Sequence, residues 1–176
     1  MDLPVSGRFR VPGSGAEAAD DRPVASPRTS PLKLVRDVLD HGGPGYLQFA
    51  ITNICNAKCD FCNFAVDRFD KAKRKSVTLQ EARDVIDICV KNHIGYLLFV
   101  GGEPLVHKDL RAMTRYAAER GIRPMICTNG SLWTEADMRN LASDGLTSVI
   151  MSIDAHDVAK HEKNRGLPDL CRKIQR

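Results

Sequence analysis

The chain has 176 residues, of which 43% are hydrophobic and 27% charged, a composition that suits a single globular core. Its net charge is only +4, and its one basic run, residues 71–75, is typical of a solvated loop and does not indicate a nucleic-acid-binding surface. No apolar run could span a bilayer and the N-terminus does not resemble a secretory signal, so we expect a cytoplasmic protein whose six cysteines are reduced.

No strand is predicted within the first 45 residues. Residues 1–30 are expected to form a disordered tail, because prolines alternate there with small and charged residues. Residues 31–45 combine a short amphipathic helix, beginning at Pro31, with a glycine-rich break over 41–45. The apolar side chains of this helix are expected on one side, and they are Leu32, Leu34, Val35, Val38 and Leu39.

From residue 46 onward, strands and helices alternate. Apolar runs predict strands at about 46–53, 96–100, 124–128 and 148–153. Apolar residues at helical spacing predict helices at about 79–92, 108–120 and 135–144, and a loop then leads to a fourth helix at about 168–176. Thr78 and Glu81 have the spacing of a capping box, and Thr134 is the expected cap of the third helix.

This order predicts an α/β fold of about four β-α units with parallel strands. A closed eight-unit barrel usually needs roughly 250 residues, so we expect a partial TIM-type (β/α) barrel over residues 46–176. The chain would then be a truncated product, a fragment, or one part of a barrel that a partner completes. The outer edges of the first and fourth strands are expected to be unpaired.

Three cysteines follow the first strand at a C-x3-C-x2-C spacing, namely Cys55, Cys59 and Cys62. Soft thiolates this close together favour an iron–sulfur cluster or zinc. Three ligands leave one metal position open. Zinc would need a fourth ligand, such as His93 or Cys89, and no second pair of cysteines at knuckle spacing is present in the sequence.

Unusual residues also follow the other three strands. Gly101, Gly102 and Glu103 come after the second strand, Thr128 and Asn129 end the third, and Ser152 and Asp154 end the fourth. In parallel α/β folds ligands bind at this carboxyl edge. Simpler explanations remain open, because Gly-Gly and Asn-Gly are common in turns and Asp154 suits a turn cap.

These motifs together resemble the radical S-adenosylmethionine (radical SAM) superfamily, particularly its molybdenum-cofactor and peptide-modifying members. The resemblance covers about residues 46–166 and includes Phe61 inside the cysteine motif and the stretch 161–166. It implies a [4Fe–4S] cluster on the three cysteines and S-adenosylmethionine (SAM) on the fourth iron. Reductive cleavage of SAM would give a 5′-deoxyadenosyl radical that abstracts hydrogen from a substrate. An electron donor such as flavodoxin or ferredoxin would be needed, and the small-molecule or peptide substrate is unknown.

The resemblance also implies roles for individual residues. Phe61 would contact the adenine of SAM, although it could be an ordinary packed aromatic. The edge formed by residues 101–103 would receive the amino group of SAM, with Glu103 as its partner. Ser152 would contact the ribose or carboxylate, Asp154 would lie beside it, and the substrate side would include Thr128 and Asn129.

Two further functions are kept as alternatives: a non-catalytic remnant that binds a cluster or SAM, and a zinc-stabilised module. Among the remaining candidates, Cys89 and Cys127 are expected to be core thiols, and Cys171 has no assigned role. His107 is expected on the surface.

Overall fold

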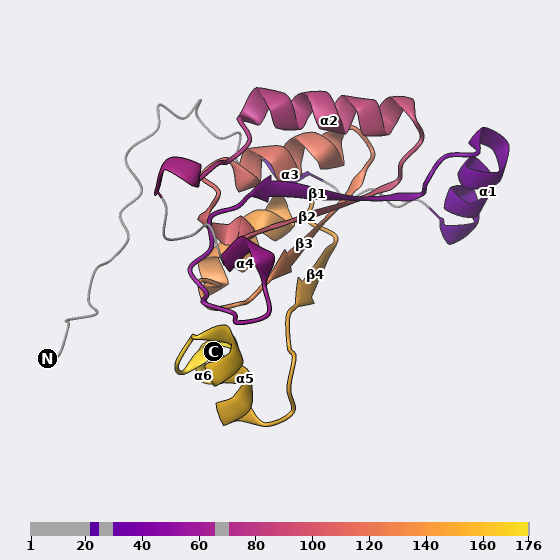
Figure 1. Cartoon of the computed structure of the whole chain (residues 1–176). Coiled ribbons are helices and arrows are strands. Elements are labelled where there is room, and N and C mark those ends of the chain that lie inside the picture. The colour runs from indigo at the N-terminus through magenta and orange to yellow at the C-terminus, as the bar shows by residue number, and fades with distance from the viewer. Residues whose placement is uncertain (1–21, 25–29, 66–70, 176) are drawn as a thin grey trace, which may run out of the picture.

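Residues 22–24, 30–65 and 71–175 are described by the computed structural model (Figure 1). The disordered tail predicted for residues 1–30 therefore lies largely outside the described residues. One short part of it is placed, because the backbone N–H of Val24 donates to the carbonyl of Ser143 at 2.8 Å.

Four parallel strands form one sheet in the order β1-β2-β3-β4. Their bounds are Tyr46–Thr52 for β1, Tyr96–Gly101 for β2, Arg123–Thr128 for β3 and Ser148–Met151 for β4. Each strand lies beside the next one in the sequence, as in a β/α barrel that has been opened. The predicted α/β partial barrel is confirmed.

Three helices connect these strands, α2 at Leu79–Lys91, α3 at Leu110–Glu119 and α4 at Glu135–Ser143. The capping box predicted at Thr78 and Glu81 is present, and the Glu81 carboxylate accepts from the Thr78 N–H at 2.7 Å. Thr134 caps α4 as predicted, and it forms a second capping box with Asp137.

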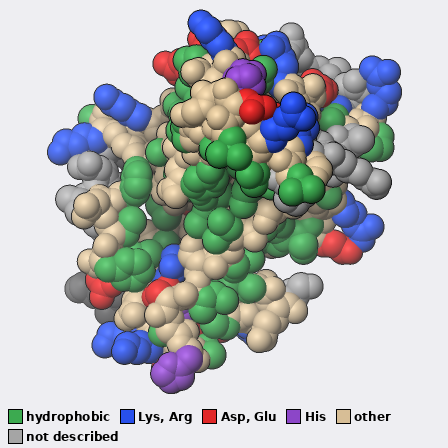
Figure 2. Space-filling view, turned by 90° about the vertical axis from the view of Figure 1, so that its right-hand side faces the viewer, with side chains coloured by type: hydrophobic (Ala, Val, Ile, Leu, Met, Phe, Trp, Pro, Cys, Tyr) green, Lys and Arg blue, Asp and Glu red, His purple; other side chains and the backbone are tan. Residues whose placement is uncertain are grey.

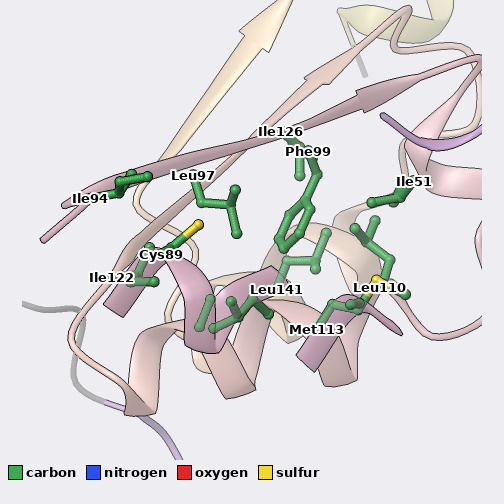
Figure 3. Packing of buried hydrophobic residues seen from close by; sticks show 13 residues of the cluster. Ile51, Cys89, Ile94, Leu97, Phe99, Leu110, Met113, Ile122, Ile126 and Leu141 are labelled. Atoms are coloured by element: carbon green, nitrogen blue, oxygen red, sulfur yellow. The ribbon is translucent and has the colours of Figure 1, made fainter. Parts of the chain in front are cut away.

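The main core lies between these helices and one face of the sheet (Figure 3). Phe99 of β2 is fully buried there, with Cys89 of α2 and Met113 of α3. Burying one such large apolar side chain contributes about 2–3 kcal/mol. The opposite face of the sheet is more open, since Ala50 and Ile150 on that face are exposed. In a β/α barrel the helices cover only the outer face of the sheet, so this arrangement is typical of one part of a barrel wall.

The outer edge of β1 differs from its prediction. Val77 donates its N–H to the carbonyl of Ile51 at 2.9 Å, and Asn53 donates to the carbonyl of Lys75 at 3.0 Å. Thr52 and Ser76 form an antiparallel bridge between these bonds. The prediction of an unpaired edge was therefore wrong for the carboxyl-terminal end of β1, because the chain returns to it before α2.

The edge of β4 has no pairing strand among residues 22–24, 30–65 and 71–175. Val149 and Ile150 point to opposite faces of this strand, and they are 38% and 40% exposed. Figure 2 shows hydrophobic side chains running through the middle of the molecular face seen there, between charged residues above and below.

The first helix, α1 (Pro31–His41), forms as predicted, with Ser30 as its N-cap. It projects beyond the amino-terminal ends of the strands (Figure 1). Leu34 packs so closely over Gly95 that a Cβ there would meet Leu34 Cδ1 at 2.3 Å. The shared apolar side is only partly covered, because Leu32 and Leu39 are 80% and 77% exposed.

The end of the chain departs most from the prediction. The loop expected after residue 154 contains a helix, α5 (Val158–Arg165), and the helix expected at 168–176 is the shorter α6 (Leu170–Ile174). Both lie below the carboxyl ends of the strands in Figure 1. Since β4 ends at Met151, Ser152 and Asp154 lie beyond the strand and not on it.

Asp144, directly after α4, joins that helix to α3 through two arginines. Its side chain is only 2% exposed, and its carboxylate accepts from Arg111 Nε at 2.6 Å and pairs with Arg115 at 3.1 Å. A carboxylate this buried is stabilised only while both guanidinium groups remain beside it.

We expect Asp144→Asn to lower the free energy of unfolding by about 2–3 kcal/mol, because two guanidinium groups would lose their anion. The value is below that of a fully buried pair because the Arg111 side chain is 40% exposed. Urea unfolding of the cofactor-free chain measures it. Glu135→Gln is the control, since it breaks a pair with Arg139 in which both side chains are 74% exposed. Equal destabilisation by both variants would contradict the stabilising role of Asp144 and its two arginines.

His107 is buried, so its predicted surface position was wrong. Its side chain is 6% exposed, and Nε2 lies 2.9 Å from the carbonyl of Val77 while Nδ1 accepts from the N–H of Asp109 at 3.1 Å. These partners fit the neutral ring that carries its proton on Nε2. Burial lowers the pKa of His107 below the ordinary value of 6.5, against the opposing effect of the Val77 hydrogen bond.

This shift predicts a pH dependence of stability. Because the folded-state pKa is lower than the unfolded one, the unfolded chain binds the proton first as the pH falls. The stabilisation is complete above about pH 6.5 and is lost as the pH falls through the folded-state pKa. Unfolding midpoints between about pH 5 and 7.5 test this. His107→Gln should flatten the slope, and a slope equal to that of the wild type would assign it to other groups.

Candidate functional site

The three cysteines of the motif lie on the loop that leaves β1, and the end of α5 supports this loop. Lys58 donates its N–H to the carbonyl of Arg165 at 2.8 Å, and Asp60 donates to the carbonyl of Asn164 at 3.3 Å. A small apolar cluster lies behind the loop, separate from the main core, and it consists of Ala57, Cys59, Leu167 and Leu170 with Cys55, Cys62 and Ile174 packed against them.

The three thiols are close enough to influence one another. Burial raises the pKa of Cys55, and the nearby charges of Glu103, Cys59 and Cys62 raise it further. Burial also raises the pKa of Cys59, although the guanidinium of Arg165 acts against this. A positive metal cluster would reverse this balance, since it favours deprotonated thiolates.

The ligands considered for zinc do not meet at this loop. Cys89 is fully buried in the main core, and His93 stacks on His41 with ring centroids 3.6 Å apart. Within the described parts of the chain, no three His, Cys, Asp or Glu side chains are grouped to hold a single ion. Cluster thiolates bind different iron atoms and need not converge on one point, so the three-cysteine loop still suits a cluster.

Gly101 and Gly102 lie against the start of the cysteine loop. A Cβ on Gly101 would meet the carbonyl oxygen of Thr52 at 2.2 Å, and one on Gly102 would meet that of Ile54 at 2.2 Å. Gly101 also has φ +134°, which favours glycine. The close approach that these glycines permit is therefore made by the chain's own backbone.

Glu103 is the buried acid of the site, with 1% of its surface exposed. Its carboxylate accepts from Thr128 Oγ1 at 2.6 Å, from the N–H of Asn129 at 2.8 Å and from the N–H of Leu105 at 3.1 Å. Burial raises its pKa, while these hydrogen bonds and the charge of Arg165 lower it. The carboxylate is thus held in place by neutral donors, and a cation beside it would be stabilised.

Thr128 and Asn129, predicted for the substrate side, are 1% and 4% exposed and face inward to Glu103. Asn129 also donates from Nδ2 to Asn56 Oδ1 at 3.0 Å, which connects the end of β3 to the cysteine loop. Gly130 follows at φ +78°, so a turn forms here as well.

A charged cluster joins the end of β4 to α5. Asp154 accepts from Arg165 Nε at 2.5 Å and lies 3.1 Å from Nδ1 of the buried His161. Burial alone would raise the pKa of Asp154, but the hydrogen bond and charge of Arg165 outweigh it and lower the pKa. The Arg165 guanidinium also lies 5.6 Å from the ring centroid of Phe61, which is 57% exposed.

Two residues of this site had no assigned role in the sequence analysis. Arg165 and His161 belong to the stretch 161–166, whose family resemblance was the only signal that marked them. Ser152 lies beside Cys127, with Oγ and Sγ 3.6 Å apart. The structure thus brings the ends of all four strands together at one edge of the sheet, and α5 joins them there.

This half-barrel carries a three-thiol loop and a buried carboxylate at its strand ends. These features are typical of α/β proteins that bind a metal cofactor at the carboxyl edge of the sheet. The family model described as "Radical SAM superfamily" matches residues 49–171, and the chain belongs to this superfamily. Proteins of the superfamily use a [4Fe–4S] cluster and SAM.

Individual relatives agree with this membership. An AdoMet-dependent heme synthase from Methanosarcina barkeri is 30% identical over 125 residues, which are 71% of this chain and 35% of the relative. A GTP 3′,8-cyclase from Synechococcus elongatus is 32% identical over 123 residues, 69% of this chain and 37% of the relative. The chain thus spans about a third of the length of these relatives.

Solved structures support the fold. SuiB from Streptococcus suis, bound to S-adenosylmethionine, superposes with a TM-score of 0.63 at 22% identity over 81% of this chain and 34% of SuiB. BtrN in complex with AdoMet and 2-DOIA gives a TM-score of 0.55 at 19% identity, over 74% of this chain and 55% of BtrN. In the part of the chain that the structure describes, no helix has the length and apolarity needed to cross a membrane.

Proposed function

We propose that this chain holds a [4Fe–4S] cluster through Cys55, Cys59 and Cys62 and binds SAM at the remaining iron, as the catalytic part of a radical SAM enzyme. The observation that carries this proposal is the placement of three mutually interacting thiols beside a buried carboxylate, Glu103, whose charge also acts on Cys55. When bound, the cluster would supply the electron that divides SAM into methionine and a hydrogen-abstracting 5′-deoxyadenosyl radical.

The neighbouring residues would bind and orient SAM. Glu103 is the partner for its ammonium group, because a buried carboxylate held only by neutral donors gains most from a cation. Phe61 is exposed within the cysteine loop and offers a ring for the adenine. Ser152 and Asp154 stand at the end of β4, where the ribose or carboxylate would lie, and the Arg165 ion pair fixes Asp154.

Anaerobic reconstitution of the purified chain tests this proposal. We expect about four irons per chain, broad absorbance near ~400 nm, and release of 5′-deoxyadenosine when SAM and a reductant such as dithionite are added. Reduced flavodoxin or ferredoxin would be the physiological class of donor. A chain that takes up no iron under these conditions would rule out the proposal.

A second candidate is a module that binds the cluster and SAM without turnover. It is favoured by the partly exposed edge of β4 within the described residues, where Val149 and Ile150 are 38% and 40% exposed. The same experiment separates the two functions. Iron uptake and SAM binding without release of 5′-deoxyadenosine would indicate the non-catalytic module. Zinc found by elemental analysis would indicate the zinc-stabilised module instead.

A further inference from the structure

Asn56 and Asn129 form a polar bridge between two loops that are far apart in the sequence. Asn129 Nδ2 donates to Asn56 Oδ1 at 3.0 Å, and Asn56 Nδ2 donates to Ser131 Oγ at 2.7 Å. The hydroxyl of Ser131 in turn donates to Asn129 Oδ1 at 2.6 Å. Each of the three side chains therefore contacts the other two, and a closed ring of hydrogen bonds results.

One end of this bridge is the cysteine loop, and the other is the acid of the site. Asn56 directly follows Cys55 in the sequence. Asn129 is 4% exposed, and its backbone N–H donates to Glu103 Oε2 at 2.8 Å. A displacement of Asn129 would therefore shift both the loop at Cys55 and the carboxylate of Glu103.

We propose that Asn129 is a positioning residue that couples Glu103 to the cysteine loop through Asn56. This role needs no direct contact of either amide with the cluster or SAM. Their role is to hold the loop in its cluster-binding shape before any cofactor arrives, at a fixed separation from the carboxylate. Preorganisation of this kind reduces the ordering entropy that binding would otherwise cost. Its importance for the cluster and SAM rests on the proposed function, whereas its effect on the loop does not.

The variant of choice is Asn56→Ala, because Asn56 is exposed while Asn129 is buried and its replacement would also disturb the turn. The matched control is Asn92→Ala. Asn92 is also an exposed asparagine. Its side chain donates one hydrogen bond, to the carbonyl of Ile88 at 2.8 Å, whereas that of Asn56 makes two, and Asn92 lies at the end of α2 away from the site.

The first measurement is amide hydrogen exchange in the cofactor-free chain. The amides of Lys58 and Asp60 are bonded to α5 and report on the loop. We expect Asn56→Ala to speed their exchange about tenfold, the effect of one to two net hydrogen bonds, and to leave the amides of β2 unchanged. Asn92→Ala should leave the loop amides unchanged.

The second measurement is the rate at which a chelator removes iron from the reconstituted chain. Asn56→Ala should release iron roughly tenfold faster, and SAM should slow this release less than it does in the wild type, since coupling between two sites is reciprocal. Loop exchange or iron release at the wild-type rate would overturn the proposal. So would a uniform acceleration of all amides, which would show a general loss of stability. If the wild type takes up no iron, the proposed function fails, and hydrogen exchange alone still decides the bridge.

Discussion

Cys59→Ala is expected to reduce the iron content of the reconstituted chain to the background level and to abolish cleavage of SAM. Cys59 is 8% exposed within the small apolar cluster behind the loop, where the other thiols of the motif are its neighbours. Two thiolates cannot retain a cluster that depends on three. Iron and sulfide analysis after anaerobic reconstitution, together with absorbance near ~400 nm, measures the effect.

Cys171→Ala is the matched control for that variant. Cys171 lies on α6, whose residues Leu170 and Ile174 belong to the apolar cluster behind the cysteine loop. If the cluster uses only the three cysteines of the motif, this variant takes up as much iron as the wild type. Full iron uptake by Cys59→Ala, or its loss in Cys171→Ala, would show that the ligands have been assigned wrongly.

The parts of the fold that sequence reasoning predicted are those in which local pattern and tertiary packing agree. The run 96–100 is apolar throughout because β2 is buried in the middle of the sheet, and the strand was found within one residue of its bounds. The capping box of Thr78 and Glu81 is a local device, so its spacing alone was sufficient.

Helix α5 was missed because its stability does not come from an apolar stripe. Of its eight residues only His161 is buried, so the periodicity that marks a surface helix is absent. Two local signals were available, the N-cap Asp157 and the C-cap Gly166 at φ +59°. Caps without a periodic pattern between them were too weak to predict a helix.

The burial of the polar side chains of His107 and Asp144 also could not be predicted from the sequence. His107 and Asp144 are buried because partners distant in the chain satisfy them, the carbonyl of Val77 for the histidine and two arginines of α3 for the aspartate. Their residue types favour the surface, and nothing in the local pattern contradicts that preference. Only the packing of α3 against its neighbours makes these partners available.

The candidate site shows the same division. Strand order alone predicted that four motifs meet at one edge, because parallel strands end there together. The contacts that hold these motifs in place depend on the register in which neighbouring strands pair. Thr128 reaches Glu103 only because β2 and β3 pair as they do, and Gly102 is needed because the chain after β1 passes directly over it.

Glu103→Gln is expected to weaken SAM binding by about a hundredfold or more, because the ammonium group would lose a buried anionic partner. Glutamine has nearly the same shape, so the substitution removes charge more than volume. Its amide nitrogen cannot accept a hydrogen bond, however, and the carboxylate accepts from two backbone N–H groups, those of Leu105 and Asn129. One of them would face a donor, at a cost of about 1–3 kcal/mol in stability.

Two measurements separate these effects: calorimetric SAM binding to the reconstituted variant, and urea unfolding of the cofactor-free chain. Glu162→Gln is the control, since Glu162 also accepts from two backbone N–H groups, those of Asp169 and Cys171, but lies on α5 outside the predicted ammonium position. Both variants should lose stability, and only Glu103→Gln should lose SAM affinity. Equal SAM affinity in the two variants would show that the buried carboxylate is a structural anchor for the end of β3 and that SAM places its ammonium elsewhere.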